Sequence, residues 1–362
     1  MTPDGSGRAW KADSTMFAVW SDDCERHEPA GEVWLGVWTP GTEVAQRAVE
    51  VRDAMAAHGH KLVTAPDRGL APMLAIHDER FVAYLSTIWH RWIEAGLDRG
   101  QPAGGRVVPY HFPLRQAVPV LRDNVAVHAE PGRWCIDTMT LIGPGTWEAA
   151  RAATWCAAEA ADLVTGGERH VFAVTRPPGH HAGRDFYGGS CYLNNAAVAC
   201  ERLIAGGARR VAIIDLDAHH PNGTQAIFWD RADVLVASTH IDPGAGWFPH
   251  WVGHADEHGP HATNLNVVLA PGTADGEWLA AVDFLVAAVR RFGPDALVLS
   301  LGVDAAADDP ESPLQVTAAG YQEAGAKLSR VAPTVVVLEG GYVLPTLGSF
   351  VAATLVGLEG GE

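Results

Sequence analysis

The feature that most constrains the fold of this chain is a series of short apolar, β-branched runs beyond about residue 150. Runs of this kind are typical of parallel strands buried on both faces. They lie at 171–175, 211–217, 234–240, 265–270, 296–302 and 334–340. Amphipathic stretches long enough for crossover helices separate several of them, at 194–205, 276–292 and 317–331. This alternation predicts an α/β fold, a doubly wound and mainly parallel sheet with helices on both faces.

The first 150 residues are harder to interpret. Segments 44–58 and 79–95 have helical patterns, whereas 100–119 is rich in Pro and Gly and indicates a loop. The sequence has no internal repeat, low-complexity tract or Gly/Ser linker. A length of 362 residues allows two average domains, but one large α/β domain is the simpler expectation. We expect a flexible N-terminus over 1–15 and one domain over 16–362.

Charge and cysteine usage limit the partners. With 26 basic and 43 acidic residues the formal net charge is −17, which disfavours nucleic acid and anionic membranes and favours a cationic substrate. The sequence has neither a secretory signal nor a span long enough for a bilayer, so we expect a cytoplasmic protein. The five cysteines are scattered and never form a CxxC pair, so any metal is expected to be held by His and carboxylate.

Metal-competent residues follow the apolar runs, at the strand ends where parallel sheets bind ligands. Along an extended chain the side chains of Asp215, Asp217 and His219 share one face. Asp304 follows another run directly. Asp217, His219 and Asp304 then form a set of one nitrogen and two oxygens that leaves a position for water, as in catalytic zinc sites. Iron(II) also suits oxygen-rich ligation, and a strand end capped by solvated polar residues is the alternative.

Further candidates lie at neighbouring strand ends. His180 and His181 follow Pro and Gly residues and are candidate bases, although a second ligand pair or packing histidines would give the same pattern. Asp215 and Asn222 are the expected partners that orient the two rings. Tyr342 follows two glycines, a pattern that is often a simple turn, but beside a metal its phenol could stabilise an oxyanion.

The segment 240–261 is rich in histidine, with His240, His250, His254, His258 and His261. We interpret these as exposed loop residues rather than a second metal site. Phe248 stands within this segment, in a loop expected to border the pocket.

Six motifs in order carry a family resemblance: RPPGHHAG (176–183), YGGSCYLNNAAVA (187–199), IIDLDAHHPNGTQ (213–225), FPHWVG (248–253), LGVDAAADDP (301–310) and LEGGY (338–342). Together they resemble the histone deacetylase family of the arginase-like fold. Within that family the chain looks most similar to the bacterial acetylpolyamine amidohydrolases, over nearly its whole length from about Met16.

The resemblance implies roles for the site residues. It implies a zinc ion bound by Asp217, His219 and Asp304. It implies that His181 is the general base, that His180 is its electrostatic companion, and that Tyr342 polarises the carbonyl. It also implies a potassium or sodium ion near the zinc site, with oxygens from Asp215, Asp217, His219 and Ser238.

The resemblance also implies how substrate is held. The backbone at Gly189 contacts the substrate amide, and Phe248 forms an aromatic tunnel wall. Ser190 stands where relatives carry a second aromatic wall, so this side of the tunnel is expected to be wider and more polar. Glu311 resembles a glutamate gatekeeper of polyamine-specific members, with a solvated turn residue as the alternative. An inserted loop near 100–134 implies a homodimer.

The expected function is therefore zinc-dependent deacetylation of acetylated polyamines. The nearest alternative is a deacetylase of protein acetyl-lysine or of another small acylated amine. A non-catalytic metal-binding module would lack a ligand, base or phenol, and none is missing. An arginase-like ureohydrolase would need two metals and more bridging acids than the sequence offers.

Overall fold

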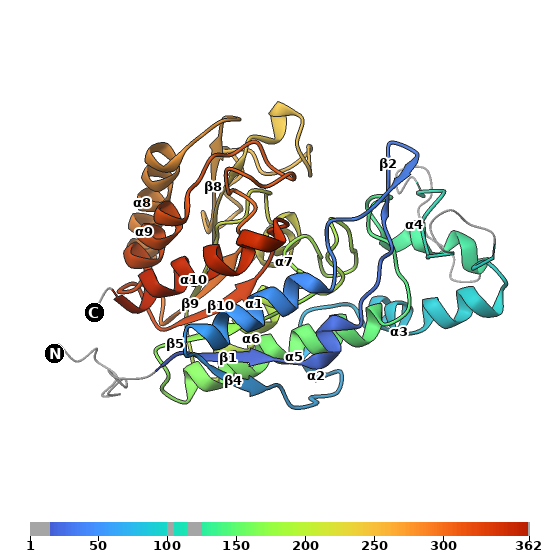
Figure 1. The fold of residues 1–362 in the computed structure, drawn as a ribbon, viewed down its shortest axis with the longest axis horizontal. Helices are drawn as coiled ribbons and strands as arrows, with labels where there is room; N and C mark the ends of the chain where they lie inside the picture. The colour runs from blue at the N-terminus through green and yellow to red at the C-terminus, as the bar shows by residue number, and fades with distance from the viewer. Residues whose placement is uncertain (1–14, 100–104, 114–124, 361–362) are drawn as a thin grey trace.

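The computed structural model describes residues 15–99, 105–113 and 125–360. Within them, eight parallel strands form one sheet in the order β4–β1–β5–β10–β9–β6–β7–β8 (Figure 1). The strands are β1 (Phe17–Trp20), β4 (Lys61–Thr64), β5 (His170–Ala173), β6 (Val211–Asp215), β7 (Val234–Ile241), β8 (Asn264–Leu269), β9 (Ala296–Leu301) and β10 (Thr334–Leu338). The prediction of a parallel α/β sheet is confirmed.

Helices cover both faces of the sheet (Figure 1). One face carries α1 (Gln46–Ala57), α8 (Asp275–Phe292), α9 (Ala318–Leu328) and α10 (Leu344–Gly360). The other carries α2 (Ala71–Leu74), α5 (Thr146–Thr165), α6 (Asn195–Ala205) and α7 (Asn222–Phe228). Side-chain caps start two of the predicted helices: Asn194 accepts from the Ala197 N–H at the start of α6, and Thr317 accepts from the Gly320 N–H at the start of α9.

A smaller subdomain-like extension lies beyond the sheet. It contains α3 (Glu79–Glu94), α4 (Pro131–Trp134) and the antiparallel hairpin of β2 (Glu32–Trp34) and β3 (Val37–Thr39). Single 3-10 turns complete the structure as η1 (Asp22–Glu25), η2 (Val127–Ala129) and η3 (Pro243–Ala245). The expected flexible N-terminus lies outside the described residues except for its last position, as do 100–104 and 114–124 of the expected inserted loop.

Several elements were not predicted. Strand β1 is only four residues long, and α10 carries apolar residues around its whole circumference. Neither element therefore shows a clear alternation of apolar and polar residues in the sequence. Helix α5 is rich in alanine and largely buried, so the sequence shows little difference in polarity between one face of this helix and the other. Its small side chains allow it to pack against β1, β5 and α6.

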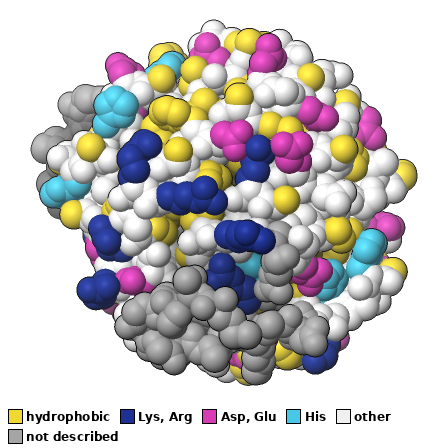
Figure 2. Space-filling view, turned by 90° about the vertical axis from the view of Figure 1, so that its left-hand side faces the viewer, with side chains coloured by type: hydrophobic (Ala, Val, Ile, Leu, Met, Phe, Trp, Pro, Cys, Tyr) yellow, Lys and Arg dark blue, Asp and Glu magenta, His cyan; other side chains and the backbone are white. Residues whose placement is uncertain are grey.

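Basic residues gather where the strands begin. Lys61, Arg169, Arg209 and Arg210 stand at the starts of three strands, and α8 ends there with Arg290 and Arg291. Figure 2 views this end of the molecule and shows Lys and Arg side chains across its middle and left. Asp and Glu side chains share this face, mainly toward its top and right (Figure 2). Of the described helices, none is long and apolar enough to cross a membrane.

Candidate active site

Four adjacent strands at the centre of the sheet, β5, β10, β9 and β6, end at one place. The loops that follow them carry the predicted site residues. Their sequence separation is large, so only the parallel sheet brings them together.

The prediction of an extended chain over 211–217 is wrong for its last two residues, because β6 ends at Asp215. The Asp217 N–H donates to Asp215 Oδ1 (3.0 Å), and the His219 N–H donates to Asp217 Oδ1 (2.9 Å). Such side-chain bonds to the backbone two residues on are typical of Asp in turns. The three side chains therefore do not share one partner: Asp215 faces His180, whereas Asp217 and His219 meet Asp304.

Asp217, His219 and Asp304 form a compact donor set. Nδ1 of His219 lies 3.0 Å from Asp304 Oδ2 and 3.2 Å from Asp217 Oδ1. One ligand atom from each residue lies within 4.8 Å of the others. Burial and the neighbouring Asp217 carboxylate raise the pKa of Asp304 to about 7, because two buried carboxylates repel without a cation. One nitrogen and two oxygens in this arrangement fit a zinc ion.

Backbone groups from other strand ends hold both carboxylates. The Gly340 N–H donates to Asp217 Oδ2 and the Ala218 N–H donates to Asp304 Oδ1, each at 2.8 Å. A Cβ atom on Gly302 would lie 2.0 Å from Asp217 Oδ2, and one on Gly340 would lie 2.6 Å from both carboxylates. Glycine at these two positions thus allows the close approach.

Gly302→Ala is expected to displace Asp217, lowering zinc affinity and destabilising the fold by about 1–3 kcal/mol, as for overpacking a core. Metal content and thermal unfolding would measure both effects. Gly276→Ala is the matched control, because a Cβ there meets nothing within 4 Å and alanine is the better helix former. Unchanged zinc binding in Gly302→Ala would show that the site tolerates the added methyl group.

The two predicted histidines have different partners. His180 Nδ1 lies 3.1 Å from Asp215 Oδ2, and His181 Nδ1 lies 2.7 Å from Asn222 Oδ1. An amide oxygen only accepts, so His181 donates from Nδ1 and keeps Nε2 as its basic nitrogen. Burial opposes charge on both rings, yet Asp217 and Asp215 raise the pKa of His180 to about 10. Burial and the neighbouring His180 and His219 instead lower the pKa of His181, leaving it neutral and able to accept a proton.

Tyr342 is half-buried at the same edge. Its ring lies against the guanidinium of Arg47, 4.8 Å from carbon to ring centroid, and its N–H donates to Asp309 Oδ2 (2.7 Å). Arg47 also donates to the carbonyls of Glu339 and Gly341, each at 2.6 Å. Burial raises the pKa of the Tyr342 phenol, so it stays protonated and can donate a hydrogen bond.

Sequence reasoning missed Arg47, Asp309 and Glu339. The buried Glu339 carboxylate accepts from the N–H groups of Gly179 (2.7 Å) and His180 (3.1 Å), which fixes the histidine loop. A charged residue ending the apolar run 334–340 was the available signal for Glu339. Arg47 lies on a helix that is remote in sequence, and nothing in its local pattern indicates a role.

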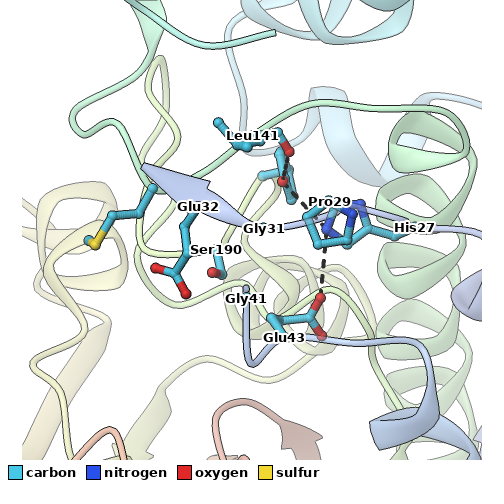
Figure 3. Close-up of a pocket in the computed structure, with 10 residues that line it drawn as sticks. His27, Pro29, Gly31, Glu32, Gly41, Glu43, Leu141 and Ser190 are labelled. Carbon is cyan, nitrogen blue, oxygen red and sulfur yellow. Dashed lines mark hydrogen bonds and ion pairs between the residues drawn. The ribbon is translucent and has the colours of Figure 1, made fainter. Parts of the chain in front are cut away.

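Gly189 and Phe248 flank His181. A Cβ on Gly189 would lie 2.3 Å from the His181 ring and 3.0 Å from Phe248, while the rings of His181 and Phe248 meet edge to face at 4.8 Å. The Gly189 N–H donates to Asp137 Oδ2 (2.6 Å). The next residue, Ser190, lines a small pocket (Figure 3).

Glu311 is tied to the N-terminal part of the chain. Thr42 Oγ1 donates to Glu311 Oε1 (2.8 Å), and the Glu311 N–H donates to Asp309 Oδ1 (3.0 Å). Glu311 is half-buried and lies close enough to Glu32 to influence its ionisation. Its side chain is therefore held in place rather than fully solvated.

The interpretation of 240–261 as exposed loop is wrong for His240. This residue belongs to β7 and is buried, with Nδ1 2.8 Å from Ser238 Oγ and Nε2 2.8 Å from the Gly253 carbonyl. Apolar neighbours and these two partners keep it inside the sheet. Ser238, expected beside a monovalent cation, thus contacts His240 here. All five cysteines are buried and free.

Comparisons with known proteins agree with this geometry. Residues 42–358 match the family model of the histone deacetylase domain. The chain is 39% identical over 350 residues to the acetylpolyamine amidohydrolase of Mycoplana ramosa, covering 95% of this chain and all of that one. It is 39% identical over 353 residues to acetylpolyamine amidohydrolase 1 of Pseudomonas aeruginosa, covering 95% and 99%. The crystal structure of acetylpolyamine aminohydrolase from Burkholderia pseudomallei superposes with a TM-score of 0.89 at 34% identity, covering 96% of this chain and 99% of the other.

Proposed function

Because this chain belongs to the histone deacetylase family, we propose that it is a zinc-dependent amidohydrolase that removes the acetyl group from acetylated polyamines. The observation that carries the proposal is the convergence of Asp217, His219 and Asp304 beside His181 and Tyr342 at the ends of adjacent strands. The names of its full-length relatives support the polyamine class of substrate.

Asp217, His219 and Asp304 would hold the zinc ion, which when bound polarises the amide carbonyl and acidifies a water molecule. His181 accepts the proton of the attacking water at Nε2, while Asn222 keeps its Nδ1 protonated. His180, whose ring centroid lies 4.0 Å from that of His181, is the electrostatic companion of this base. Tyr342 donates its phenolic hydrogen bond to the carbonyl oxygen. His181 then passes its proton to the amine nitrogen as the C–N bond breaks, which gives acetate and a free amine.

Glu311 supports a cationic substrate. An acetylated polyamine keeps at least one ammonium group beyond its amide, and a half-buried carboxylate attracts that charge more strongly than a solvated one. Thr42 and Asp309 hold Glu311 at the edge of the site.

Glu311→Gln is expected to lower kcat/KM for acetylputrescine about tenfold or more, as for losing a charge-assisted contact. The same variant should change hydrolysis of a neutral acetyl-lysine peptide much less. Asp308→Asn, an exposed acid nearby, is the matched control. Equal losses on both substrates would remove Glu311 from recognition of the amine.

We also propose a homodimer and a potassium or sodium ion beside the zinc site. The dimer is supported by exposed apolar side chains in the extension beyond the sheet, among them Trp34, Leu35, Val37, Tyr110 and Phe112. The ion would take oxygens from Asp215, Asp217, His219 and Ser238. Sedimentation velocity tests the first proposal, and activity in matched lithium and potassium salts tests the second.

A steady-state panel tests the function. Zinc-loaded enzyme would be assayed on acetylputrescine, acetylcadaverine, acetylspermidine and an acetyl-lysine peptide. We expect the acetylated polyamines to have the higher kcat/KM values. A preference for the peptide would favour protein deacetylation, and hydrolysis of none would refute the amidohydrolase assignment.

A further inference from the structure

The loop 247–253 carries the aromatic side chain that lies against the candidate base. The ring of Phe248 meets the His181 ring edge to face at 4.8 Å, and a Cβ on Gly189 would lie 3.0 Å from Phe248. Residues 246–263, all of which the structure describes, form neither helix nor strand. Because the backbone groups of such a segment are not paired in a helix or a sheet, other partners must fix its position.

Gly253, at the end of this loop, is held from two sides. Its carbonyl accepts from His240 Nε2 (2.8 Å) on β7. Its N–H donates to the carboxylate of Glu257, with distances of 3.1 Å to Oε1 and 3.0 Å to Oε2. The φ of Gly253 is 102°, a value that favours glycine, and a Cβ here would lie 2.6 Å from the His220 ring. The chain is therefore fixed closely at this position.

Gln225 in turn holds Glu257. A carboxylate only accepts hydrogen bonds, so the amide nitrogen of Gln225 donates to Glu257 Oε2 (2.6 Å). The amide oxygen of Gln225 then faces three buried donors, Nδ2 of Asn264 (2.8 Å), Nδ2 of Asn266 (3.0 Å) and Nε2 of His220 (2.9 Å). Each group in this cluster has one direction of donation, so Glu257 is held in a single orientation.

His240 is held by the same reasoning. The Gly253 carbonyl only accepts, so the neutral His240 ring carries its hydrogen on Nε2, and Nδ1 accepts from Ser238 Oγ (2.8 Å). His240 is fully buried, and its ring meets the His220 ring at 4.6 Å. We call His240, Gln225 and Glu257 the Gly253 anchor.

Tight turns connect the Gly253 anchor to the aromatic ring. Phe248 and Gly253 are five residues apart. Between them the His250 N–H donates to the Trp247 carbonyl (3.0 Å), and the Trp251 N–H donates to the Pro249 carbonyl (2.7 Å). A compact segment of this kind has little slack, so a shift of Gly253 also moves Phe248.

We propose that the Gly253 anchor positions Phe248 against His181 and thereby sets the width of the space that the substrate amine occupies, an inference that rests on the proposed function. The three anchor residues are positioning residues, since they act through Gly253 and Phe248. The anchor gives the buried part of the histidine-rich segment a role in substrate selectivity. It holds an aromatic wall at fixed distance from the base, which excludes amines that are branched near the amide.

Glu257→Gln is the sharpest variant, because it keeps the shape of the side chain and replaces one acceptor by a donor. In the wild type Oε2 accepts from Gln225, and Oε1 accepts from the His254 N–H (3.1 Å). Whichever way the new amide turns, its NH2 group faces a donor. Amide hydrogen exchange within 247–256 should therefore accelerate about tenfold or more. Asp256→Asn, at the neighbouring exposed acid, is the matched control and should leave exchange unchanged.

Selectivity is measured as the ratio of kcat/KM for acetylputrescine to that for its analogue with a methyl branch next to the amide nitrogen. Both substrates carry one ammonium group, so the ratio reports width rather than charge. Glu257→Gln and Phe248→Ala should each lower it about tenfold, the order of discrimination that one methyl-sized group provides in a close-fitting site. The double variant should match Phe248→Ala, because residues that act through one another are not additive. Zinc content should stay unchanged in Glu257→Gln.

Gly253→Ala perturbs the same contact without changing charge, and it should give the same changes in exchange and in selectivity. An unchanged ratio in folded variants would overturn the role of the Gly253 anchor while leaving the deacetylase assignment intact. Additive effects of Glu257→Gln and Phe248→Ala would do the same, since Glu257 would then not act through Phe248. A wild-type enzyme that hydrolyses neither substrate would instead overturn the proposed function.

Discussion

Asp217→Ala is expected to abolish zinc binding and to lower kcat/KM by well over 100-fold. Replacing a residue that merely orients a ligand costs up to about 100-fold, and Asp217 would itself be one of only three ligands. The variant also deprives the Gly340 N–H of its acceptor. Elemental analysis after dialysis would measure bound metal, and steady-state assays would measure activity.

Two further variants separate ligation from folding. Asp217→Asn keeps an oxygen for the Gly340 N–H but provides a poorer ligand, so it should fold normally and still lose zinc. Asp308→Ala removes an exposed acid near Asp304 and should keep both metal and activity. Full zinc content in Asp217→Asn would mean that Asp217 is not a ligand.

Tyr342→Phe is expected to lower kcat by about 100- to 1,000-fold, the range for losing one oxyanion donor, with KM and zinc content nearly unchanged. The phenyl ring of the variant would still pack against Arg47, and the backbone hydrogen bond to Asp309 does not involve the hydroxyl group. His181→Ala should be at least as severe, because His181 transfers protons in both halves of the reaction. Tyr110→Phe, at a 70% exposed tyrosine, is the control, and wild-type turnover by Tyr342→Phe would exclude the phenol from the mechanism.

Much of the sheet and the donor set could be predicted because both depend on local patterns. Buried parallel strands are apolar along their length, and residues following them must meet at one edge. Asp217 and Asp304 could be paired on that basis alone. The turn after Asp215 could not be predicted. The carboxylates of Asp215 and Asp217 each accept a hydrogen bond from the backbone N–H two residues on, which ends the extended conformation within a short segment.

The supporting contacts were beyond sequence reasoning for a different reason. Arg47 and the carbonyl of Gly341 are 294 residues apart, and Thr42 reaches Glu311 across 269 residues. No local pattern encodes such partners. Glu32 likewise belongs to a three-residue strand, and its proximity to Glu311 and Asp137 arises only in the folded chain.

The position of β10 has a consequence for how the chain folds during synthesis. This strand is the last of the sheet in sequence, yet it lies between β5 and β9. Before residues 334–338 leave the ribosome, the β4–β1–β5 group and the β9–β6–β7–β8 group are not joined, and each exposes an apolar strand edge. Unpaired edges of this kind promote aggregation. Chain termination shortly before β10 should therefore yield an aggregation-prone nascent protein even though Asp217, His219 and Asp304 have all been synthesised.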